Sequence, residues 1–366
     1  MEGVSAHGLL TSTRGNHMVR VRGLTGVMTA AALVATAALV AGCGSTPTTS
    51  GTCSKTYHVG LVTDVGKLSD KSFNANAWQG VQDAVNDKSL CVEARVIESN
   101  QPTDYQKNMQ LFIQQKYDMI VTVGFLLGDD TLAVAKANPD TKFAIVDYAY
   151  DKPPANLTGL VFREDQAGFL AGIVAGKMTK TGKIGGVYGL DIPPVHKYRV
   201  GYENGAKYAN ASVKTLGVYQ PPSGAKSFND PDWGKQQATA MFGQGADIVF
   251  GAGGNTGNGA LLAAVQANKL CVGVDVDQYL SYPDAQKCLV TSAEKHIALA
   301  VKTSIEDMVK NTWPSNGLLS FDAKNSGVGI SPFHNYESQV PAEVKTMVQD
   351  ALKKLADGTL QTGYKG

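Results

Sequence analysis

Short apolar runs alternate with amphipathic helical patterns along most of this chain, and this alternation constrains the fold more than any other feature. Strands that are apolar throughout, with helices between them, are typical of parallel sheets covered on both faces. The expected strands form two successive series, at 58–64, 91–97, 117–123, 142–147 and 158–162, then at 183–189, 213–219, 247–252, 270–275 and 288–292. The expected helices between them are 72–87, 103–116, 129–138, 164–179, 194–211, 231–243 and 256–269. The sequence therefore predicts an α/β protein with two doubly wound parallel-sheet lobes.

Two further helical patterns follow the second series, at 293–311 and 341–357, and each needs a sheet to cover. We therefore expect the chain to cross between the lobes three times, near residues 162, 290 and 322. The predicted N-lobe comprises 57–161 and 291–322, and the predicted C-lobe comprises 162–290 and 323–366.

The composition excludes several classes of protein. With 366 residues, 43% of them hydrophobic, the chain is too long and too apolar for a disordered segment or one small domain. A formal net charge of +1 argues against a nucleic-acid-binding protein, because phosphate recognition needs concentrated Lys and Arg. The six histidines lack metal-ligand spacing, and no G-x-S-x-G nucleophile motif is present. We therefore expect neither a metal, nor a cofactor, nor a catalytic residue set.

The N-terminal region has the pattern of a secretory signal. Residues 23–42 are apolar, follow Arg20 and Arg22, and end in small residues. A membrane-spanning anchor is the alternative, since about 20 apolar residues can cross a bilayer. Met18 opens a conventional signal by itself, so a start there is a second alternative.

The end of this segment, V-A-G-C, resembles the lipobox of bacterial lipoproteins, in which the cysteine receives lipid and becomes the mature N-terminus. This resemblance implies removal of residues 1–42 and lipidation of Cys43. Residues 43–56 would then form a short tether, because the tract is rich in Thr, Ser and Gly.

Four cysteines remain if Cys43 carries lipid, and an even number in an exported protein favours disulfides, with free thiols as the alternative. Cys53 precedes the first expected strand and Cys91 opens the second. Cys271 and Cys288 stand in the same relation in the second series. Neighbouring strands are about 4.8 Å apart, which a disulfide can span. We predict Cys53–Cys91 and Cys271–Cys288, both at the edge opposite the ligand.

In doubly wound proteins the ligand binds beyond the carboxyl ends of the strands. Asp64, Asp147 and Asp275 stand at three of these ends, without an array of basic residues beside them. The glycine-rich segment 251–257 lacks the Gly-Lys-Ser/Thr ending of a phosphate loop. These observations predict a polyhydroxylated neutral ligand, although a lone Asp at a strand end can also be a helix cap.

The most informative stretch is 62–78, VTDVGKLSDKSFNANAW. It leads from a strand end through a glycine turn into a helix capped near Asp70 or Ser72. Trp78 begins the face of that helix that points to the core. Phe73 lies off this face in the first turn, where an aromatic ring suits stacking on a ligand. Packing of Phe73 in the core is the alternative.

Four segments together resemble the Basic Membrane Protein family of substrate-binding lipoproteins of ABC transporters, and are similar to its purine-nucleoside receptors. They are 62–78, 251–257 (GAGGNTG), 272–279 (VGVDVDQY) and 289–296 (LVTSAEKH), and the resemblance covers 57–357. It implies a type I periplasmic-binding-protein fold with a three-segment hinge and a nucleoside between the lobes. It also implies a monomer on the extracytoplasmic face of the cell membrane, anchored by lipid, with permease and ATPase subunits as partners.

The family pattern assigns roles by position. Phe73 matches a stacking aromatic, Asp147 a base-binding carboxylate, and Asp64 and Asn74 flanking polar contacts. Tyr148 and Tyr150 are alternatives to Asp147.

Asp275 matches a ribose-binding carboxylate, with Asp277 as the fallback, and Lys295 a ribose-binding lysine, or alternatively a solvated one. Gly253 and Gly254 would allow main chain to approach the sugar.

The second stacking aromatic matches Phe228, with Tyr219 and Trp233 as alternatives. Phe125 and Trp78 are further candidates for the site.

We therefore expect capture of a nucleoside, with a purine base preferred. A pentose receptor of the same fold and a nucleoside hydrolase are the alternatives. Asp275 and Asp277 would point to opposite faces of a strand, which argues against an acid–base pair.

Overall fold

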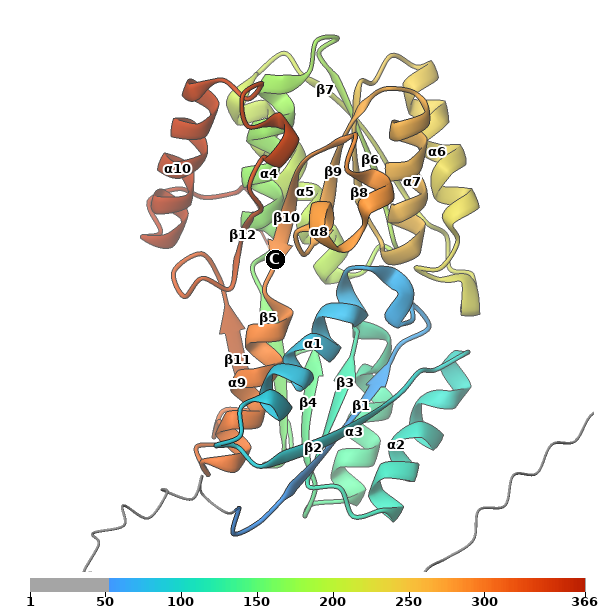
Figure 1. Ribbon diagram of the computed structural model, residues 1–366, viewed down its shortest axis with the longest axis vertical. Coiled ribbons are helices and arrows are strands. Elements are labelled where there is room, and N and C mark those ends of the chain that lie inside the picture. Colours follow the sequence, from blue (N-terminus) through green and yellow to red (C-terminus); the bar gives the residue numbers. More distant parts are fainter. Residues whose placement is uncertain (1–52, 366) are drawn as a thin grey trace, which may run out of the picture. The chain divides into compact units, whose positions relative to one another are not determined.

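The structure is a computed structural model that describes residues 53–365. The predicted signal peptide and the predicted lipidation site Cys43 lie outside the described residues. Two six-stranded sheets, each flanked by helices, form the two lobes (Figure 1). Within residues 53–365, no helix is both long and apolar enough to cross a membrane.

The first sheet has the strand order β11-β5-β4-β3-β1-β2 and is parallel throughout. Its strands are β1 (Tyr57–Thr63), β2 (Val92–Ile97), β3 (Met119–Val123), β4 (Lys142–Val146), β5 (Leu157–Phe162) and β11 (Leu318–Phe321). The helices that belong to this lobe are α1 (Phe73–Asn86), α2 (Tyr105–Gln114), α3 (Gly128–Ala137) and α9 (Ile297–Val309).

The second sheet has the order β12-β10-β9-β8-β6-β7, with only β12 antiparallel to its neighbour among these pairs. Its strands are β6 (Lys183–Tyr188), β7 (Lys214–Tyr219), β8 (Ile248–Ala252), β9 (Leu270–Asp275), β10 (Leu289–Lys295) and β12 (Val328–Ile330). Its helices are α4 (Glu164–Met178), α5 (Pro193–Ala209), α6 (Pro231–Gly243), α7 (Gly254–Gln266), α8 (Gln278–Ser281) and α10 (Ala342–Ala356). The two sheets have equivalent orders, so β4 of the first lobe corresponds to β9 of the second.

The chain passes from one sheet to the other after β5, after β10, and between β11 and β12. The second passage differs from the sequence prediction, which placed it near residue 290. β10 pairs with β9 up to Glu294 and with β12 up to Lys295, so 291–295 belongs to the second sheet. The helix that follows, α9, returns to the first lobe, where the Ala298 amide donates to Asn76 Oδ1 of α1 (2.6 Å). The short strands β11 and β12 were not predicted.

Helices α4 and α5 pack with their main chains in contact, and this contact fixes one wall of the cleft. A Cβ atom on Gly172 of α4 would lie 2.2 Å from the carbonyl oxygen of Tyr202. A Cβ on Gly201 of α5 would lie 2.1 Å from the carbonyl oxygen of Asp165. Only glycine allows this approach, which brings Glu164 at the start of α4 close to Tyr198 on α5.

Both predicted disulfides are present. Cys53 bonds to Cys91 beside the start of β2, and Cys271 in β9 bonds to Cys288 just before β10, with Cα separations of 5.8 and 5.0 Å. Each bridge joins neighbouring parallel strands near their amino ends, as the spacing predicted.

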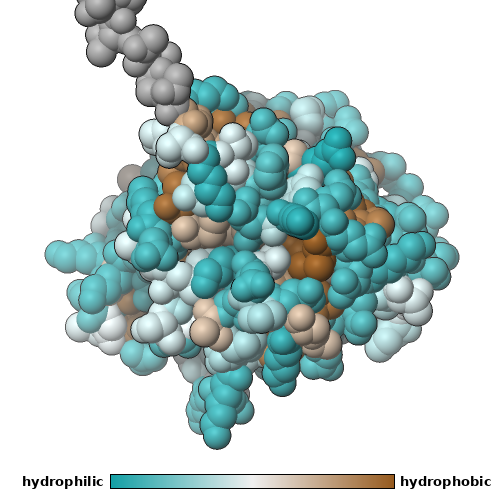
Figure 2. All heavy atoms as spheres, turned by 90° about the horizontal axis from the view of Figure 1, so that it is seen from below, coloured by the Kyte–Doolittle hydropathy of each residue, from teal (hydrophilic) through white to brown (hydrophobic). Residues whose placement is uncertain are grey.

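The face shown in Figure 2 is mainly hydrophilic, with small apolar areas separated by polar side chains. Large hydrophobic residues that are exposed among those described are scattered over different elements: Leu111, Tyr208, Leu280 and Leu299. Single exposed apolar side chains are usual on soluble surfaces.

Candidate functional site

A cavity lies where the carboxyl ends of the strands of the two sheets face each other. About 540 Å³ of space free of atoms, part of it open solvent, lies between its walls. Its walls include all nine ligand-binding residues predicted from the sequence: Asp64, Phe73, Asn74, Asp147, Phe228, Gly253, Gly254, Asp275 and Lys295. The further candidate Phe125 also lines it.

The loop after β1 forms a polar wall of this cavity. Asp64 Oδ1 accepts hydrogen bonds from the Gly66 amide (2.8 Å) and from Asn74 Nδ2 (2.9 Å). The Asp70 carboxylate accepts from the amides of Ser72 (3.0 Å) and Asn74 (2.7 Å), so Asp70 provides the side-chain cap of α1.

Asn74, which lines the cavity, has a buried side-chain acceptor. Its side chain is 1% exposed, and its Oδ1 has no hydrogen-bond partner within residues 53–365. A buried polar atom without a partner is costly. This oxygen is therefore well suited to accept a hydrogen bond from a ligand.

An aromatic ring from each lobe lines the cavity, Phe73 at the start of α1 and Phe228 in the loop before α6. Phe228 has a positive φ of 60°, and its amide donates to Gln220 Oε1 (2.8 Å), which fixes the loop. A Cβ on Gly189 would lie 2.1 Å from the Phe228 ring, so glycine there makes room for it. The site thus has two aromatic surfaces on opposite lobes.

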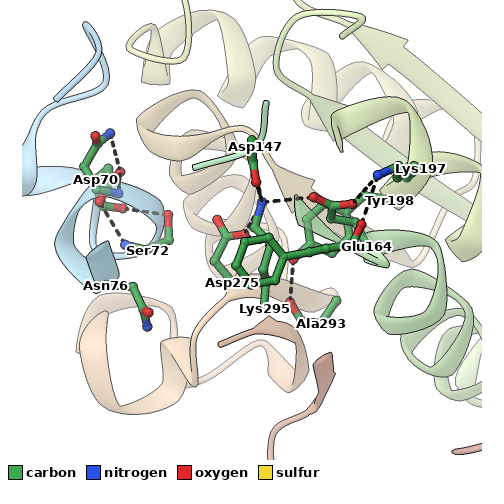
Figure 3. Close-up of polar contacts among 12 residues, drawn as sticks. Asp70, Ser72, Asn76, Asp147, Glu164, Lys197, Tyr198, Asp275, Ala293 and Lys295 are labelled. Atoms are coloured by element: carbon green, nitrogen blue, oxygen red, sulfur yellow. Dashed lines mark hydrogen bonds and ion pairs between the residues drawn. The ribbon is translucent and has the colours of Figure 1, made fainter. Parts of the chain in front are cut away.

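A buried ammonium lies among three carboxylates at the centre of the site (Figure 3). Lys295 Nζ is 2.8 Å from Asp147 Oδ2, 3.4 Å from Glu164 Oε1 and 3.8 Å from Asp275 Oδ1. The Tyr198 hydroxyl donates to Asp275 Oδ1 (3.1 Å). Lys295 is 2% exposed, so these contacts compensate for a charge that solvent barely reaches.

Burial is the largest single influence on the pKa of each of these groups. It raises the pKa of Asp147 and of Asp275, and the Lys295 ammonium opposes that rise in both. For Lys295 itself burial lowers the pKa, but the three carboxylates outweigh burial and the pKa is raised. Lys295 is therefore a cation at neutral pH.

The acidic groups of the β1 loop follow the same rule. Burial raises the pKa of Asp70 to about 7, against the hydrogen bonds from Asn74, Ser72 and Ala75. Burial likewise raises the pKa of Asp64, against hydrogen bonds from Asn74 and Gly66.

Asp147 and Asp275 occupy equivalent places in the two lobes. Asp147 follows β4, Asp275 ends β9, and their φ angles are 73° and 64°. Residues other than glycine rarely adopt this conformation, and it costs about 1–3 kcal/mol where it persists at functional sites. The strained main chain directs both carboxylates into one cavity.

Gly253 and Gly254 line the cavity but are also required by their surroundings. A Cβ on Gly253 would lie 2.5 Å from the Gly189 amide nitrogen. Gly254 has a φ of 57°, and its Cβ would lie 2.9 Å from the carbonyl oxygen of Phe228.

Six residues weighed from the sequence do not line this cavity, and Tyr148 and Tyr150, the alternatives to Asp147, are two of them. Asp277 caps α8 and pairs with His334 Nε2 at 2.7 Å. Trp78 packs against the core, and Tyr219 stacks with Arg199, whose guanidinium carbon is 4.8 Å from the ring centroid. Trp233 packs against the apolar core of the second lobe.

Several residues of the site were not found from the sequence. Tyr198 and Asp70 line the cavity together with Gly66, Gly124, Ile192, Pro194, Val195, Ala252 and Val274. Glu164 contacts Lys295 from behind the wall. The sequence does carry a signal for Asp70, because the motif predicts it as a candidate cap of the helix that begins near residue 72. Tyr198 and Glu164 lie on helices whose approach to the sheet sequence patterns do not reveal.

Comparison with known proteins assigns the chain to a family. The family described as "ABC transporter substrate-binding protein PnrA-like" (Bmp) matches residues 57–360. The chain belongs to this Bmp family. The resemblance noted from the motifs is therefore confirmed, and members of the family are substrate-binding components of ABC transporters.

Individual relatives agree with this assignment. An ABC transporter nucleoside-binding protein of Lactococcus lactis is 31% identical over 93% of this chain and 99% of its own length. Basic membrane protein A of Borreliella burgdorferi is 34% identical over 74% of this chain and 78% of its own. A crystal structure of an ABC transporter solute-binding protein from Aeropyrum pernix has a TM-score of 0.75 and 25% identity, covering 83% of this chain and 92% of that one. The periplasmic-binding-protein fold is thus confirmed for this Bmp protein.

Proposed function

We propose that this Bmp protein captures a nucleoside with a purine base in the cleft and delivers it to an ABC importer. The observation that carries the proposal is the convergence of Phe73 and Phe228, from opposite lobes, with buried carboxylates in one cavity. Aromatic stacking contributes about 1–3 kcal/mol per base in nucleic-acid systems. The name of the Lactococcus lactis relative, a nucleoside-binding protein, supports the same ligand class.

The base would lie between Phe73 and Phe228. Asp147 would accept N–H donors from the edge of the base, with Asp64 and Asn74 beside it. An acceptor role suits Asn74, whose buried Oδ1 has no partner within residues 53–365. A buried acceptor left unpaired costs about 1–3 kcal/mol, which would give these groups their selectivity.

The sugar would lie toward Asp275 and Lys295, whose oxygen and nitrogen atoms are 3.8 Å apart. A carboxylate accepts from ribose hydroxyls and an ammonium donates to them. Gly253 and Gly254 would let the main chain approach this end of the ligand.

The remaining parts of the proposal concern location and partners. Lipidation of Cys43 would anchor a monomer on the extracytoplasmic face of the cell membrane, and permease and ATPase subunits would receive the ligand. Intact mass of the protein extracted from membranes, with and without Cys43→Ala, tests the anchor.

A thermal-shift screen with nucleosides, free bases and ribose tests the ligand. We expect inosine, guanosine or adenosine to raise the melting temperature, because a ligand at 100 times its Kd stabilises by about 2.7 kcal/mol. Stabilisation by ribose alone would establish the pentose receptor instead. Release of free base from inosine during incubation would establish a hydrolase.

A further inference from the structure

Glu164 lies behind Lys295, outside the wall of the ligand cavity, and is the first residue of α4. Its side chain is 1% exposed. Its Oε1 is 3.4 Å from Lys295 Nζ, and its Oε2 is 3.2 Å from Lys197 Nζ on α5 (Figure 3). A buried carboxylate thus connects a lysine of the site with a second lysine that does not line the cavity.

The contacts of Lys295 show what this carboxylate can do. In this structure the ammonium is shared by Asp147, Asp275 and Glu164. If a nucleoside binds as proposed above, Asp147 and Asp275 both accept hydrogen bonds from the ligand. Glu164 is then the carboxylate of the three that the ligand does not engage, so it remains to balance the buried ammonium.

Both lysines and Glu164 also lie next to passages between the lobes. Glu164 is two residues beyond the end of β5, and Lys295 is the last residue of β10. Lys197 Nζ additionally donates to the carbonyl oxygen of Phe162 at the end of β5 (2.9 Å). The Lys197–Glu164–Lys295 arrangement therefore holds the sugar-facing lysine from two of the three connecting segments.

We propose that Glu164, held by Lys197, is a positioning residue that keeps the Lys295 ammonium directed at the sugar of the ligand. The proposal rests on the nucleoside site described above and adds a residue pair to it. Glu164 acts through Lys295 and touches no ligand atom.

The charged, polar and aromatic groups around Glu164 and Lys295 come from several elements. They are Asp147 after β4, Asp275 on β9, Tyr198 and Lys197 on α5, and the rings of Phe73 on α1 and Phe162 on β5. Burial raises the pKa of Glu164, Lys295 and Lys197 lower it, and Asp147 raises it. Removal of the Lys197 charge therefore raises the Glu164 pKa further, so that its protonation begins at a higher pH.

The test compares the wild type with Glu164→Gln, Lys197→Met and the double variant. Kd is measured by calorimetry between pH 5.5 and 8.5 for inosine, guanosine, adenosine, the free bases and ribose. Glu203→Gln is the matched control, because Glu203 is on α5 but pairs with Arg199 (2.8 Å). We expect Glu164→Gln to weaken nucleoside binding about tenfold, the size of a charged hydrogen bond, and free bases less than about threefold.

The pH profile separates positioning from a structural role. In Lys197→Met the loss of nucleoside affinity on acidification should move up by about one pH unit. This shift should become much smaller in the double variant, because no carboxylate remains at residue 164 to titrate. A residual shift through Asp147 is expected, since Lys197 also lowers the pKa of that carboxyl. The Lys197→Met variant alters a side chain that is 21% exposed, so it serves even if Glu164→Gln fails to fold.

Equal losses for nucleosides and free bases, or a shift of undiminished size in the double variant, would overturn the proposal. The nucleoside assignment fails separately, if the wild type binds ribose alone. In that case a tenfold loss of ribose affinity in Glu164→Gln would still support the positioning of Lys295.

Discussion

Asn258 Nδ2, on α7 of the second lobe, donates a hydrogen bond of 2.8 Å to the carbonyl oxygen of Asp70 in the first lobe. The side chain of Asp70 caps α1, which carries Phe73 and Asn74. Asn258 Oδ1 in turn accepts from Gln278 Nε2 (2.9 Å), and Gln278 Oε1 accepts from the Val274 amide (2.9 Å). A buried polar chain thus connects β9, where Asp275 stands, with the loop that leads into α1 and Phe73.

Replacement of Asn258 by alanine should speed release of the ligand. A neutral hydrogen bond is worth about 0.5–1.5 kcal/mol, which predicts a dissociation rate about three to tenfold higher with little change in association. Stopped-flow measurement with the best-binding nucleoside checks this. Ser281→Ala is the control: Ser281 also bridges the lobes by donating to the Lys71 carbonyl oxygen (2.7 Å), but that hydrogen bond is exposed to solvent. Identical release rates for wild type and Asn258→Ala would contradict this role.

The stability of the ligand-free protein should depend on Asp70 below neutral pH. Burial raises the Asp70 pKa from 3.8 to about 7 in the folded chain. Between these values the folded state holds more protons than the unfolded state, so the free energy of unfolding falls as pH rises from about 4 to 7. Asp70→Asn should flatten this dependence, as measured by urea denaturation at pH 5 and 7.5. A slope that is the same in both proteins would show that Asp70 is ionised throughout.

Much of the fold followed from the sequence, because buried parallel strands are apolar throughout and helices separate them. β3 and β8, with every residue buried, were predicted within one or two residues. β11 and β12 were not, because strands of four and three residues carry too little periodicity. The second crossing between the lobes was predicted too early in the chain for a related reason. Polar side chains such as Glu294 and Lys295 indicate the end of a buried strand when only the sequence is considered. The buried contacts of Lys295 show why the strand continues.

The site was predicted to a similar extent. Strand-end carboxylates and the motif around Phe73 identified residues whose positions are set by the sheet itself. Glu164, Lys197 and Tyr198 were missed, because their approach depends on the glycine-mediated contact between α4 and α5. Asp277 is the opposite case, a residue considered for the site from its sequence position that lies outside the cavity. It is two residues beyond Asp275 and caps α8.

Loss of either disulfide should affect stability and leave ligand affinity unchanged. Both bridges lie at the amino ends of strands, opposite the cleft, and close loops of 38 and 17 residues in sequence separation. Removing a native disulfide typically lowers the free energy of unfolding by about 2–5 kcal/mol. We expect this loss for Cys53→Ala with Cys91→Ala, and separately for Cys271→Ala with Cys288→Ala. Urea denaturation measures this loss of stability. Calorimetry at 15 °C should give the same Kd for each double variant as for the wild type, and a changed Kd would show that the bridge is coupled to the cleft.

Phe73 and Asp275 should affect different parts of the ligand. Phe73→Ala should weaken nucleosides by about 10- to 100-fold, the range of one lost stacking contact, and leave ribose binding unaffected because a sugar has no π-face. Asp275→Asn should weaken nucleosides and ribose more than free bases, since hydroxyl hydrogen bonds to a carboxylate are lost.

Phe228→Ala should follow Phe73→Ala, whereas Tyr219→Ala, outside the cavity, should match the wild type. Calorimetric titration of each variant with a nucleoside, its free base and ribose gives the complete pattern. Because stacking and hydroxyl binding act on opposite ends of the ligand, the crossed result also tests its orientation in the cleft. If Phe73→Ala and Asp275→Asn lose all three compounds to the same extent, the ligand does not lie with its base between the rings and its sugar at Asp275.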